Sequence, residues 1–255
     1  MFRKSNTQYY IELALKSQPK HVVFFHISIY HTGYMNFLLV NKPEGWTSFD
    51  AVAYIRKHAD TAALRTDSKQ KRVKVGHAGT LDPFATGLLI IGVGREATKQ
   101  LDRCKEMPKT YRAVIMLGKT STTQDKTGVI TENTVTDAQI PDKDRITEVL
   151  HSMTGMQMQT PPMFSAKKIN GQRLYTLARK GIEIERKPNQ IEIMNIHLLE
   201  YNWPLLTVEV ECSAGTYIRT LAQDIGEKLG IGAYCQELTR TRIGPYSLSN
   251  AINLT

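Results

Sequence analysis

The sequence contains few cysteines and no long apolar run. Only three cysteines occur among the 255 residues, and no two of them form a C-x-x-C pair. Their odd number and wide spacing argue against a disulfide framework and against a zinc site, and they fit a reducing cytosol. No apolar stretch approaches the roughly 20 residues of a membrane span, and no signal peptide with a small-residue cleavage site occurs. We therefore expect a cytoplasmic globular protein with no metal and no membrane contact.

Acidic residues are fewer than basic ones. The chain has 33 Lys and Arg against 24 Asp and Glu, a net charge of +9, and its pI is near 9.4. Such an excess favours a polyanionic partner such as nucleic acid, although charge alone does not separate nucleic acid from an acidic membrane surface. The length allows one large domain, or one domain with a small appendage.

The sequence motifs that bind nucleotide cofactors are incomplete or missing in this chain. Residues 92–97, GVGREA, follow an apolar run and imitate a dinucleotide fingerprint. That fingerprint requires an acidic residue about twenty positions later, where this chain has Arg112, and no βαβ pattern follows. A P-loop is excluded as well, because no Gly-Lys-Ser/Thr occurs. The sequence predicts no cofactor.

The stretch 73–99 has the densest set of turn and strand signals. Asp82 precedes Pro83, and the proline ring disfavours a helical conformation in the residue before it, so Asp82 is expected on a loop. Glycines on both sides of Asp82 allow the backbone to turn sharply and to approach a ligand closely. The apolar run 88–91 predicts a buried strand after the loop. An arbitrary pattern of this kind most often marks an ordinary turn.

Residues 76–83, GHAGTLDP, followed by ATG at 85–87, resemble the active-site motif of the TruB family, the bacterial tRNA pseudouridine-55 synthases. Other blocks of the chain resemble the same family in the same order, and the resemblance covers residues 35–246. One departure is Thr122, which stands where the family's turn has an aspartate. The further blocks are NKPEG at 41–45, the Tyr-Arg pair at 111–112, the turn at 120–128, the long block at 159–181, GTYIRTLA at 215–222 and ELTRTRIGP at 237–245.

The resemblance implies an α+β pseudouridine synthase fold, with a mixed, mostly antiparallel sheet, surrounding helices and a basic thumb insertion at about 159–187. The catalytic domain is expected to span residues 35–250. Residues 1–34 would be an N-terminal extension outside this domain, and the family's extra C-terminal RNA-binding domain is expected to be absent. Three histidines of the extension are five residues apart and align on neither a helix face nor a strand face, so they predict no metal site.

Local patterns predict individual elements. Thr47-x-x-Asp50 matches a capping box, so a helix should begin near residue 47. Residues 142–153 show the apolar stripe of a helix. Leu221, Ile225 and Leu229 indicate the core-facing side of a further helix, on which Arg219 would ordinarily face the surface. Strands are expected over 22–25, 36–40, 88–91, 109–118, 190–202 and 205–212.

The implied reaction is the isomerisation of a uridine in the TΨC arm of tRNA, at position 55, to pseudouridine. A C-glycoside must replace an N-glycoside, so the base is detached, turned and reattached within one closed site. Because the base lies inside a folded arm, the nucleotide must first leave its stack. Two alternatives stay open: a guide-RNA-dependent rRNA pseudouridylase, which shares the GTLDP core, and a tRNA-binding folding chaperone, which needs only a basic surface.

The match to the family's motifs assigns expected roles. Asp82 is the expected nucleophile, acting at the ribose C1′ or together with loss of the C2′ proton. Arg219 would keep this carboxylate ionised. Tyr111 would stack on the extruded base or take the sugar proton, and His77 would fill the vacated space. The other candidates would line the pocket or make RNA or structural contacts: Tyr217, Leu238, Lys42 and Asp125.

The segment 159–187 concentrates positive charge. It has seven basic and two acidic residues, a local net charge of +5. Phe164 and Tyr175 lie among these charges, as in surfaces that hold phosphates and stack bases. A solvated amphipathic helix after a Pro-Pro turn would explain the same pattern. The family uses this region as a thumb that closes on the RNA, so we expect a monomer that binds tRNA phosphates through Lys167, Lys168, Arg173, Arg179 and Lys180.

Overall fold

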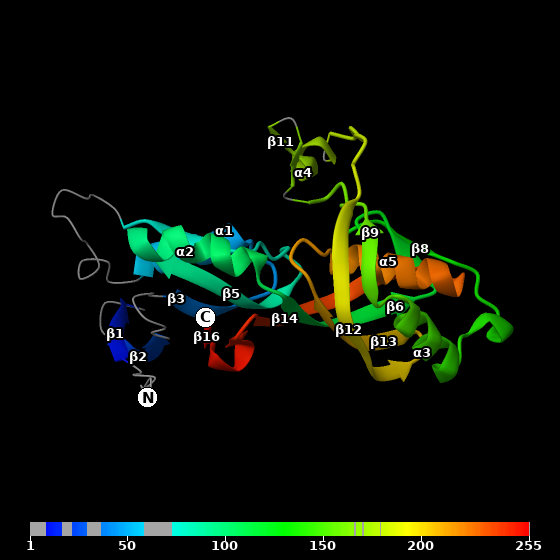
Figure 1. Cartoon of the computed structure of the whole chain (residues 1–255), viewed down its shortest axis with the longest axis horizontal. Helices are drawn as coiled ribbons and strands as arrows, with labels where there is room; N and C mark the ends of the chain where they lie inside the picture. Colours follow the sequence, from blue (N-terminus) through cyan, green and yellow to red (C-terminus); the bar gives the residue numbers. More distant parts are fainter. Residues whose placement is uncertain are drawn as a thin grey trace, which may run out of the picture. The chain divides into compact units, whose positions relative to one another are not determined.

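The computed structural model describes residues 9–16, 22–29, 37–58, 73–165, 167–169, 171–178 and 180–254. The chain folds into two compact units, one made of residues 1–107 and 241–255 and the other of residues 108–240. Each unit combines helices with strands that are mostly antiparallel (Figure 1). This confirms the predicted α+β class with a mixed, mostly antiparallel sheet. No helix within the described ranges is long and apolar enough to cross a membrane.

The first unit has a small sheet with one helix on each face. In the sheet β5 pairs antiparallel with both β3 and β4, and β3 pairs in parallel with β16. The elements are β3 (Phe37–Lys42), α1 (Ser48–His58), β4 (Val75–Ala78), β5 (Thr86–Val93), α2 (Arg95–Glu106), β15 (Tyr246–Ser247), η3 (Leu248–Asn250) and β16 (Ile252–Asn253).

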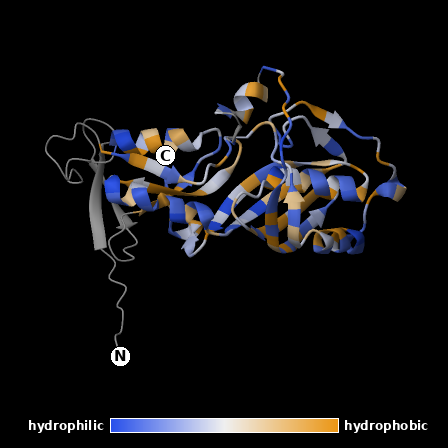
Figure 2. Cartoon of the chain, turned by 45° about the horizontal axis from the view of Figure 1, so that its top comes forward, coloured by the Kyte–Doolittle hydropathy of each residue, from blue (hydrophilic) through white to orange (hydrophobic). Residues whose placement is uncertain are grey.

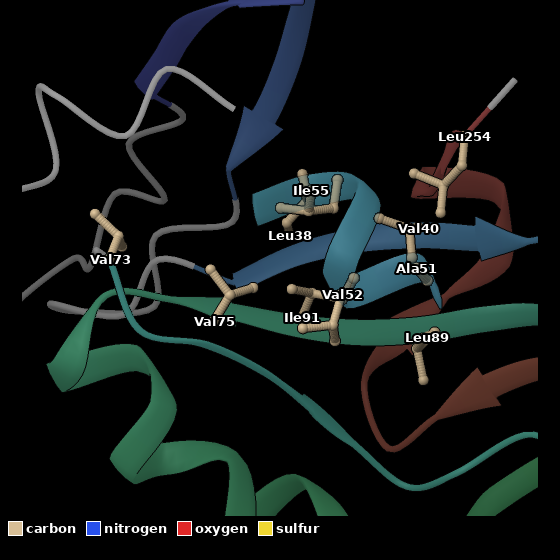
Figure 3. Packing of buried hydrophobic residues seen from close by; sticks show 10 residues of the cluster. All are labelled: Leu38, Val40, Ala51, Val52, Ile55, Val73, Val75, Leu89, Ile91 and Leu254. Atoms are coloured by element: carbon tan, nitrogen blue, oxygen red, sulfur yellow. The ribbon is translucent and has the colours of Figure 1, made fainter. Parts of the chain in front are cut away.

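Both faces of β3 and β5 are buried. Neighbouring residues of these strands point to opposite faces, and a different helix covers each face. The cluster on the α1 face includes Leu38, Val40, Ala51, Val52, Ile55, Leu89 and Ile91 (Figure 3). The cluster on the α2 face includes Phe37, Leu39, Leu88, Ile90, Ala97, Leu101 and Cys104. A strand buried on both faces has a continuous apolar run, which is why the runs at 37–40 and 88–91 predicted these strands correctly.

Helix α1 begins where the capping box predicted. The Asp50 carboxylate accepts the Thr47 N–H at 2.8 Å, and the Thr47 hydroxyl accepts the Asp50 N–H at 3.1 Å. These two bonds satisfy amides that the first turn of a helix leaves without intrahelical partners. Val52 and Ile55 are buried, as expected.

Two strands precede this unit's sheet in the sequence. β1 (Tyr9–Lys16) and β2 (Val22–Ile29) pair antiparallel from Tyr9 opposite Ile29 to Lys16 opposite Val22. The predicted strand at 22–25 is therefore confirmed and is longer than its apolar core. Contacts join β2 to β3 and β1 to α1.

The second unit has a five-strand sheet in the order β14, β6, β13, β12, β9. The last four strands pair antiparallel. Its larger elements are β6 (Lys109–Leu117), α3 (Lys143–Ser152), β9 (Gly155–Gln159), β12 (Asn189–Asn202), β13 (Leu205–Cys212), α5 (Ile218–Leu229) and β14 (Ala233–Ile243). Shorter ones are β7 (Lys119–Ser121), β8 (Ile130–Glu132), η2 (Asp137–Gln139), β10 (Lys168–Ile169), β11 (Gln172–Arg173) and α4 (Leu174–Ala178).

Along β6 of this sheet, every second side chain is buried. Val208 and Val210 of β13 lie opposite Ala113 and Tyr111 of β6, and all four side chains are buried. Arg112, on the other face of β6, is exposed. Figure 2 shows hydrophobic and hydrophilic residues alternating along the strands of this unit. The prediction of a largely buried strand at 109–118 is confirmed, because Arg112 is the one exposed residue of β6. In β13 the predicted residues Leu206, Val208 and Val210 are buried, and Thr207 between them is buried as well.

The two longer helices of this unit follow the expected stripes. Asp142 caps α3 by accepting the Arg145 N–H at 2.8 Å, and Ile146, Val149 and Leu150 are buried. In the thumb segment the structure differs from a long amphipathic helix. A short β10–β11 hairpin leads into α4, which has only five residues.

The carboxyl group of Asp224 on α5 makes stability depend on pH. Burial raises its pKa from 3.8 to about 6, Glu227 adds to the shift, and Lys228 opposes it. Because the pKa is higher in the folded state, the charged carboxylate is destabilising, and stability is lost as the pH rises from about 4 to about 6. Asp224→Asn should raise the free energy of unfolding by about 1 to 2 kcal/mol at pH 8 and by almost nothing at pH 4. Denaturant melts at both pH values measure this.

The control for the loss of one negative charge is Asp137→Asn, since Asp137 is exposed. A gain of the same size at pH 4 and pH 8 for Asp224→Asn would contradict the role of burial.

Candidate active site

Asp82 lies on the loop between β4 and β5, as predicted, and is half-buried. Hydrogen bonds hold the residues on either side of it. The Ser48 hydroxyl accepts the Leu81 N–H at 2.8 Å and donates to the Leu81 carbonyl at 3.2 Å. The Gly45 N–H donates to the Pro83 carbonyl at 2.8 Å. The segment before α1 therefore holds the backbone of the Asp82 loop in one conformation while the Asp82 side chain remains partly accessible.

Lys42 is completely buried, at 0% exposure. Its ammonium group donates to the carbonyls of Trp46 at 2.7 Å, Pro43 at 2.8 Å and Pro83 at 3.4 Å. A buried ammonium group needs hydrogen-bond acceptors in place of water. These contacts link the 41–48 segment to the Asp82 loop.

His77 lies on β4 opposite Ile91 of β5 and is half-buried. Its strand leads directly into the Asp82 loop. The first unit thus holds three of the predicted site residues on contiguous elements. The remaining ones belong to the second unit.

Tyr111 lies on β6 opposite Val210 and is mostly buried, and Leu238 is buried on β14. Tyr217 immediately precedes α5 and is half-buried. Its N–H donates to the Gln159 side chain at 2.8 Å, and its carbonyl accepts from the same amide at 3.1 Å. A side chain outside the predicted set therefore fixes the backbone of Tyr217.

Arg219 is buried at the start of α5, with 2% exposure, although its position in the sequence suggested the surface. Its guanidinium donates to the Thr123 carbonyl at 2.9 Å, to Asp125 Oδ2 at 3.2 Å and to the Phe164 carbonyl at 2.8 Å. Its side chain therefore joins two distant segments to α5. A buried charge requires such a partner set, because an uncompensated ion in the interior is strongly destabilising.

Asp125 is the counter-charge, with 4% exposure. Its Oδ1 accepts the Thr123 hydroxyl at 2.7 Å and the Thr127 N–H at 2.9 Å, while Oδ2 faces Arg219. Thr122, which departs from the family pattern, accepts the Val129 N–H at 3.0 Å through its hydroxyl and so closes the same turn.

Gln124 holds this turn on α5. Its side-chain carbonyl accepts the Thr220 hydroxyl at 3.0 Å, and its amide donates to Gln223 at 2.6 Å. Its φ of 64° is the left-handed conformation, unusual for a residue other than glycine. Gln124 lies in the turn at 120–128, but no periodicity in the sequence signals such contacts.

The basic residues predicted to bind phosphate differ in their surroundings. Lys167 Nζ donates to Asn189 Oδ1 at 2.9 Å. Lys180 is exposed, and the backbones of Lys168 and Arg173 pair in the β10–β11 hairpin. Arg179 lies outside the described residues.

The structure thus brings Arg219, Asp125 and the backbone of the thumb segment together within the second unit. Asp82, His77 and Lys42 belong to the first unit. The pairing of Asp82 with Arg219 stays a prediction.

Comparisons with known proteins identify the class to which this arrangement belongs. In a crystal structure of a Cbf5-Nop10-Gar1 complex, one chain matches 86% of this chain with a TM-score of 0.61 and 28% identity. A chain of an H/ACA RNP bound to a substrate RNA containing 2′-deoxyuridine matches the same share with a TM-score of 0.58 and 26% identity. This chain spans about half the length of those two chains, 52% and 50%.

Relatives found by sequence have a higher identity to this chain than the two solved structures have. Proteins named tRNA pseudouridine synthase B are 44% identical over 217 residues in Protochlamydia amoebophila and 43% identical over 220 residues in Bacteroides fragilis. The matches cover 85% of this chain and 77% and 89% of those proteins. The family model "TruB family pseudouridylate synthase (N terminal domain)" matches residues 65–218, and "tRNA pseudouridylate synthase B C-terminal domain" matches residues 219–255. The chain therefore belongs to the TruB family of pseudouridylate synthases, which are isomerases.

The buried Arg219–Asp125 pair predicts a large effect on stability. Asp125→Ala leaves the guanidinium buried without its counter-charge, so the free energy of unfolding should fall by about 3 to 5 kcal/mol. Glu148→Ala is the control, because Glu148 binds Arg145 at 2.6 Å in a pair whose side chains are 50% and 70% exposed. It should cost at most about 1 kcal/mol. Urea unfolding of both variants makes the comparison, and equal losses would contradict the assigned burial.

Proposed function

We propose that this chain isomerises a uridine of the TΨC arm of tRNA, at position 55, to pseudouridine, with Asp82 as the nucleophile. The observation that carries the proposal is the 44% identity to a tRNA pseudouridine synthase B over 85% of the chain. The GHAGTLDP loop, with its backbone fixed on both sides of Asp82, supports the assignment of the nucleophile.

The chemistry is an isomerisation and needs no second substrate. The N1–C1′ bond of the uridine breaks, the base turns within the site, and a C5–C1′ bond forms. The proton lost from C5 is balanced by the proton gained at N1. Asp82 assists the first step either by attack on C1′ or by a route that begins with loss of the C2′ proton. Both routes require an ionised carboxylate on a rigid loop.

Residues of the second unit serve the reacting nucleotide in this proposal. Arg219 keeps the Asp82 carboxylate ionised, and its planar guanidinium is already fixed by Asp125 and two backbone carbonyls. Tyr111 stacks on the base or takes the sugar proton, and Tyr217 lines the pocket. Leu238 supplies apolar surface beside them.

His77 fills the space that the uridine leaves when it is extruded. Its place on the strand that leads into the Asp82 loop supports this role. We further propose that the protein binds tRNA as a monomer and that residues 1–34 lie outside the catalytic domain.

A guide-RNA-dependent activity is the second candidate, because the solved structures with TM-scores of 0.61 and 0.58 are chains of H/ACA-type complexes. Their identity to this chain is 28% and 26%, against 44% for the tRNA enzymes. The higher identity favours a substrate recognised without a guide. A purely RNA-folding role requires no carboxylate on a fixed loop, so loss of Asp82 also separates that role from catalysis.

Asp82→Asn keeps the size of the side chain but removes its ability to attack carbon. We expect turnover to vanish while tRNA binding persists, because the phosphate contacts lie in the thumb. Single-turnover pseudouridine formation on an unmodified tRNA transcript, measured beside tRNA affinity, tests this. Asp102→Asn, an exposed substitution on α2, is the control. Product formation by Asp82→Asn at a rate near that of the wild type would refute the mechanism.

The same assay separates the two roles of Tyr111. Tyr111→Phe keeps the stacking face and loses the hydroxyl. A large loss of rate assigns the proton transfer to the hydroxyl, whereas a near-normal rate leaves stacking as its role.

The charge of the thumb predicts a salt dependence. Lys180 is exposed in a segment of net charge +5, so it is free to contact phosphate. Lys180→Ala should lower the slope of log affinity against log salt by about one unit. Lys143→Ala on α3, also exposed, is the matched control and should leave the slope unchanged. An unchanged slope for Lys180→Ala would show that this charge faces only solvent.

A further inference from the structure

The thumb leaves and rejoins the second unit at a single point. Gln159 is the last residue of β9 and pairs with Asn189, the first residue of β12. The segment between them is therefore an insertion between two paired strand ends. The contacts that fix Gln159 therefore also fix the point from which the thumb extends.

The side chain of Gln159 is bound to the peptide backbone at the start of α5. It is buried, with 5% exposure. Its Oε1 accepts the Tyr217 N–H at 2.8 Å, and its Nε2 donates to the Tyr217 carbonyl at 3.1 Å. A primary amide offers one acceptor and two donors, so it can satisfy both polar groups of one residue as a neighbouring strand would. The Tyr217 carbonyl also accepts the Leu221 N–H at 3.1 Å, and α5 begins with this hydrogen bond.

A second hydrogen bond joins the root of the thumb to α5, at Phe164, five residues after Gln159. Arg219 Nη2 donates to the Phe164 carbonyl at 2.8 Å. The first residues of the thumb are thus tied to α5 twice, once at Tyr217 and once at Arg219. The other guanidinium contacts go to Thr123 and Asp125, so a shift of the thumb root or of the start of α5 changes how Arg219 is oriented.

We propose that Gln159 is a positioning residue. Together with the contact between Arg219 and the Phe164 carbonyl, its side-chain amide sets Tyr217 and Arg219 relative to the root of the thumb. The inference rests on the proposed function, in which Tyr217 and Arg219 serve the reaction. Gln159 itself touches no substrate in this account. Its loss should slow the chemical step more than it weakens binding, because the phosphate contacts lie further out on the thumb.

The matched pair of variants is Gln159→Met and Gln157→Met. Methionine keeps the length of the side chain and removes both hydrogen bonds. Gln157 lies two residues earlier on the same strand, and its side chain donates to the Met153 carbonyl at 3.0 Å. For each variant the single-turnover rate constant, the tRNA dissociation constant and the melting temperature are measured. Hydrogen exchange is followed by mass spectrometry in peptides covering residues 160–165 and 213–222.

For Gln159→Met we expect the rate constant to fall by about tenfold or more, and tRNA affinity to change by less than about threefold. Exchange should rise in both peptides. Gln157→Met should behave as the wild type in all four measurements. Equal rate constants for the two variants, or a loss of rate explained entirely by unfolded protein, would overturn the proposal.

Gln159→Asn covers the case in which the methionine variant does not fold. Asparagine keeps a neutral amide, but it is one methylene shorter and cannot make both bonds to Tyr217. It should fold, bind tRNA and still lose rate, and a wild-type rate would overturn the proposal. If the wild-type protein forms no pseudouridine, the proposed function fails. The hydrogen-exchange data then test only whether Gln159 anchors the thumb to the start of α5. Equal exchange in Gln159→Met and Gln157→Met would refute that anchoring.

Discussion

A buried guanidinium needs an acceptor for its N–H groups, and in the second unit this requirement draws three segments together. Arg219 meets it with the carboxylate of Asp125 and the carbonyl of Thr123, both from one turn, and with the carbonyl of Phe164 from the thumb. Hydrogen bonds to a charged group are stronger than those between neutral groups, so they can order such segments where apolar contacts are few. The start of α5 is therefore a structural junction as well as a proposed part of the site.

In the first unit, hydrogen bonds to backbone carbonyls hold the Asp82 loop. This loop follows a sheet whose central strands are packed on both faces, so the loop begins and ends on rigid elements. Ser48 and the ammonium group of Lys42 then fasten the loop through backbone carbonyls. A reactive side chain placed in this way needs little ordering when a substrate arrives.

Much of this architecture could be predicted from local patterns. The capping box at Thr47, the apolar runs of β3 and β5 and the stripe of α3 each depend on residues close in the sequence, and periodicity records such neighbours. The burial of Arg219 and the amide contacts of Gln124 and Gln159 depend on segments up to 99 residues away. Hydrogen bonds of single side chains leave no periodic trace. The motif resemblance assigned a role to Arg219, whereas it included Gln124 and Gln159 within its blocks without indicating their contacts.

The pairing of Gln159 with Asn189 also bears on how the thumb can change over time. Because the segment departs and returns at neighbouring, hydrogen-bonded residues, its length does not alter the register of β9 against β12. The entropic cost of a longer loop grows only as the logarithm of its length, about 0.6 kcal/mol for each doubling. Insertions, deletions or exchange of the outer thumb are therefore compatible with an unchanged sheet. The length and charge of the thumb can therefore diverge between relatives while the strands that carry it keep their register.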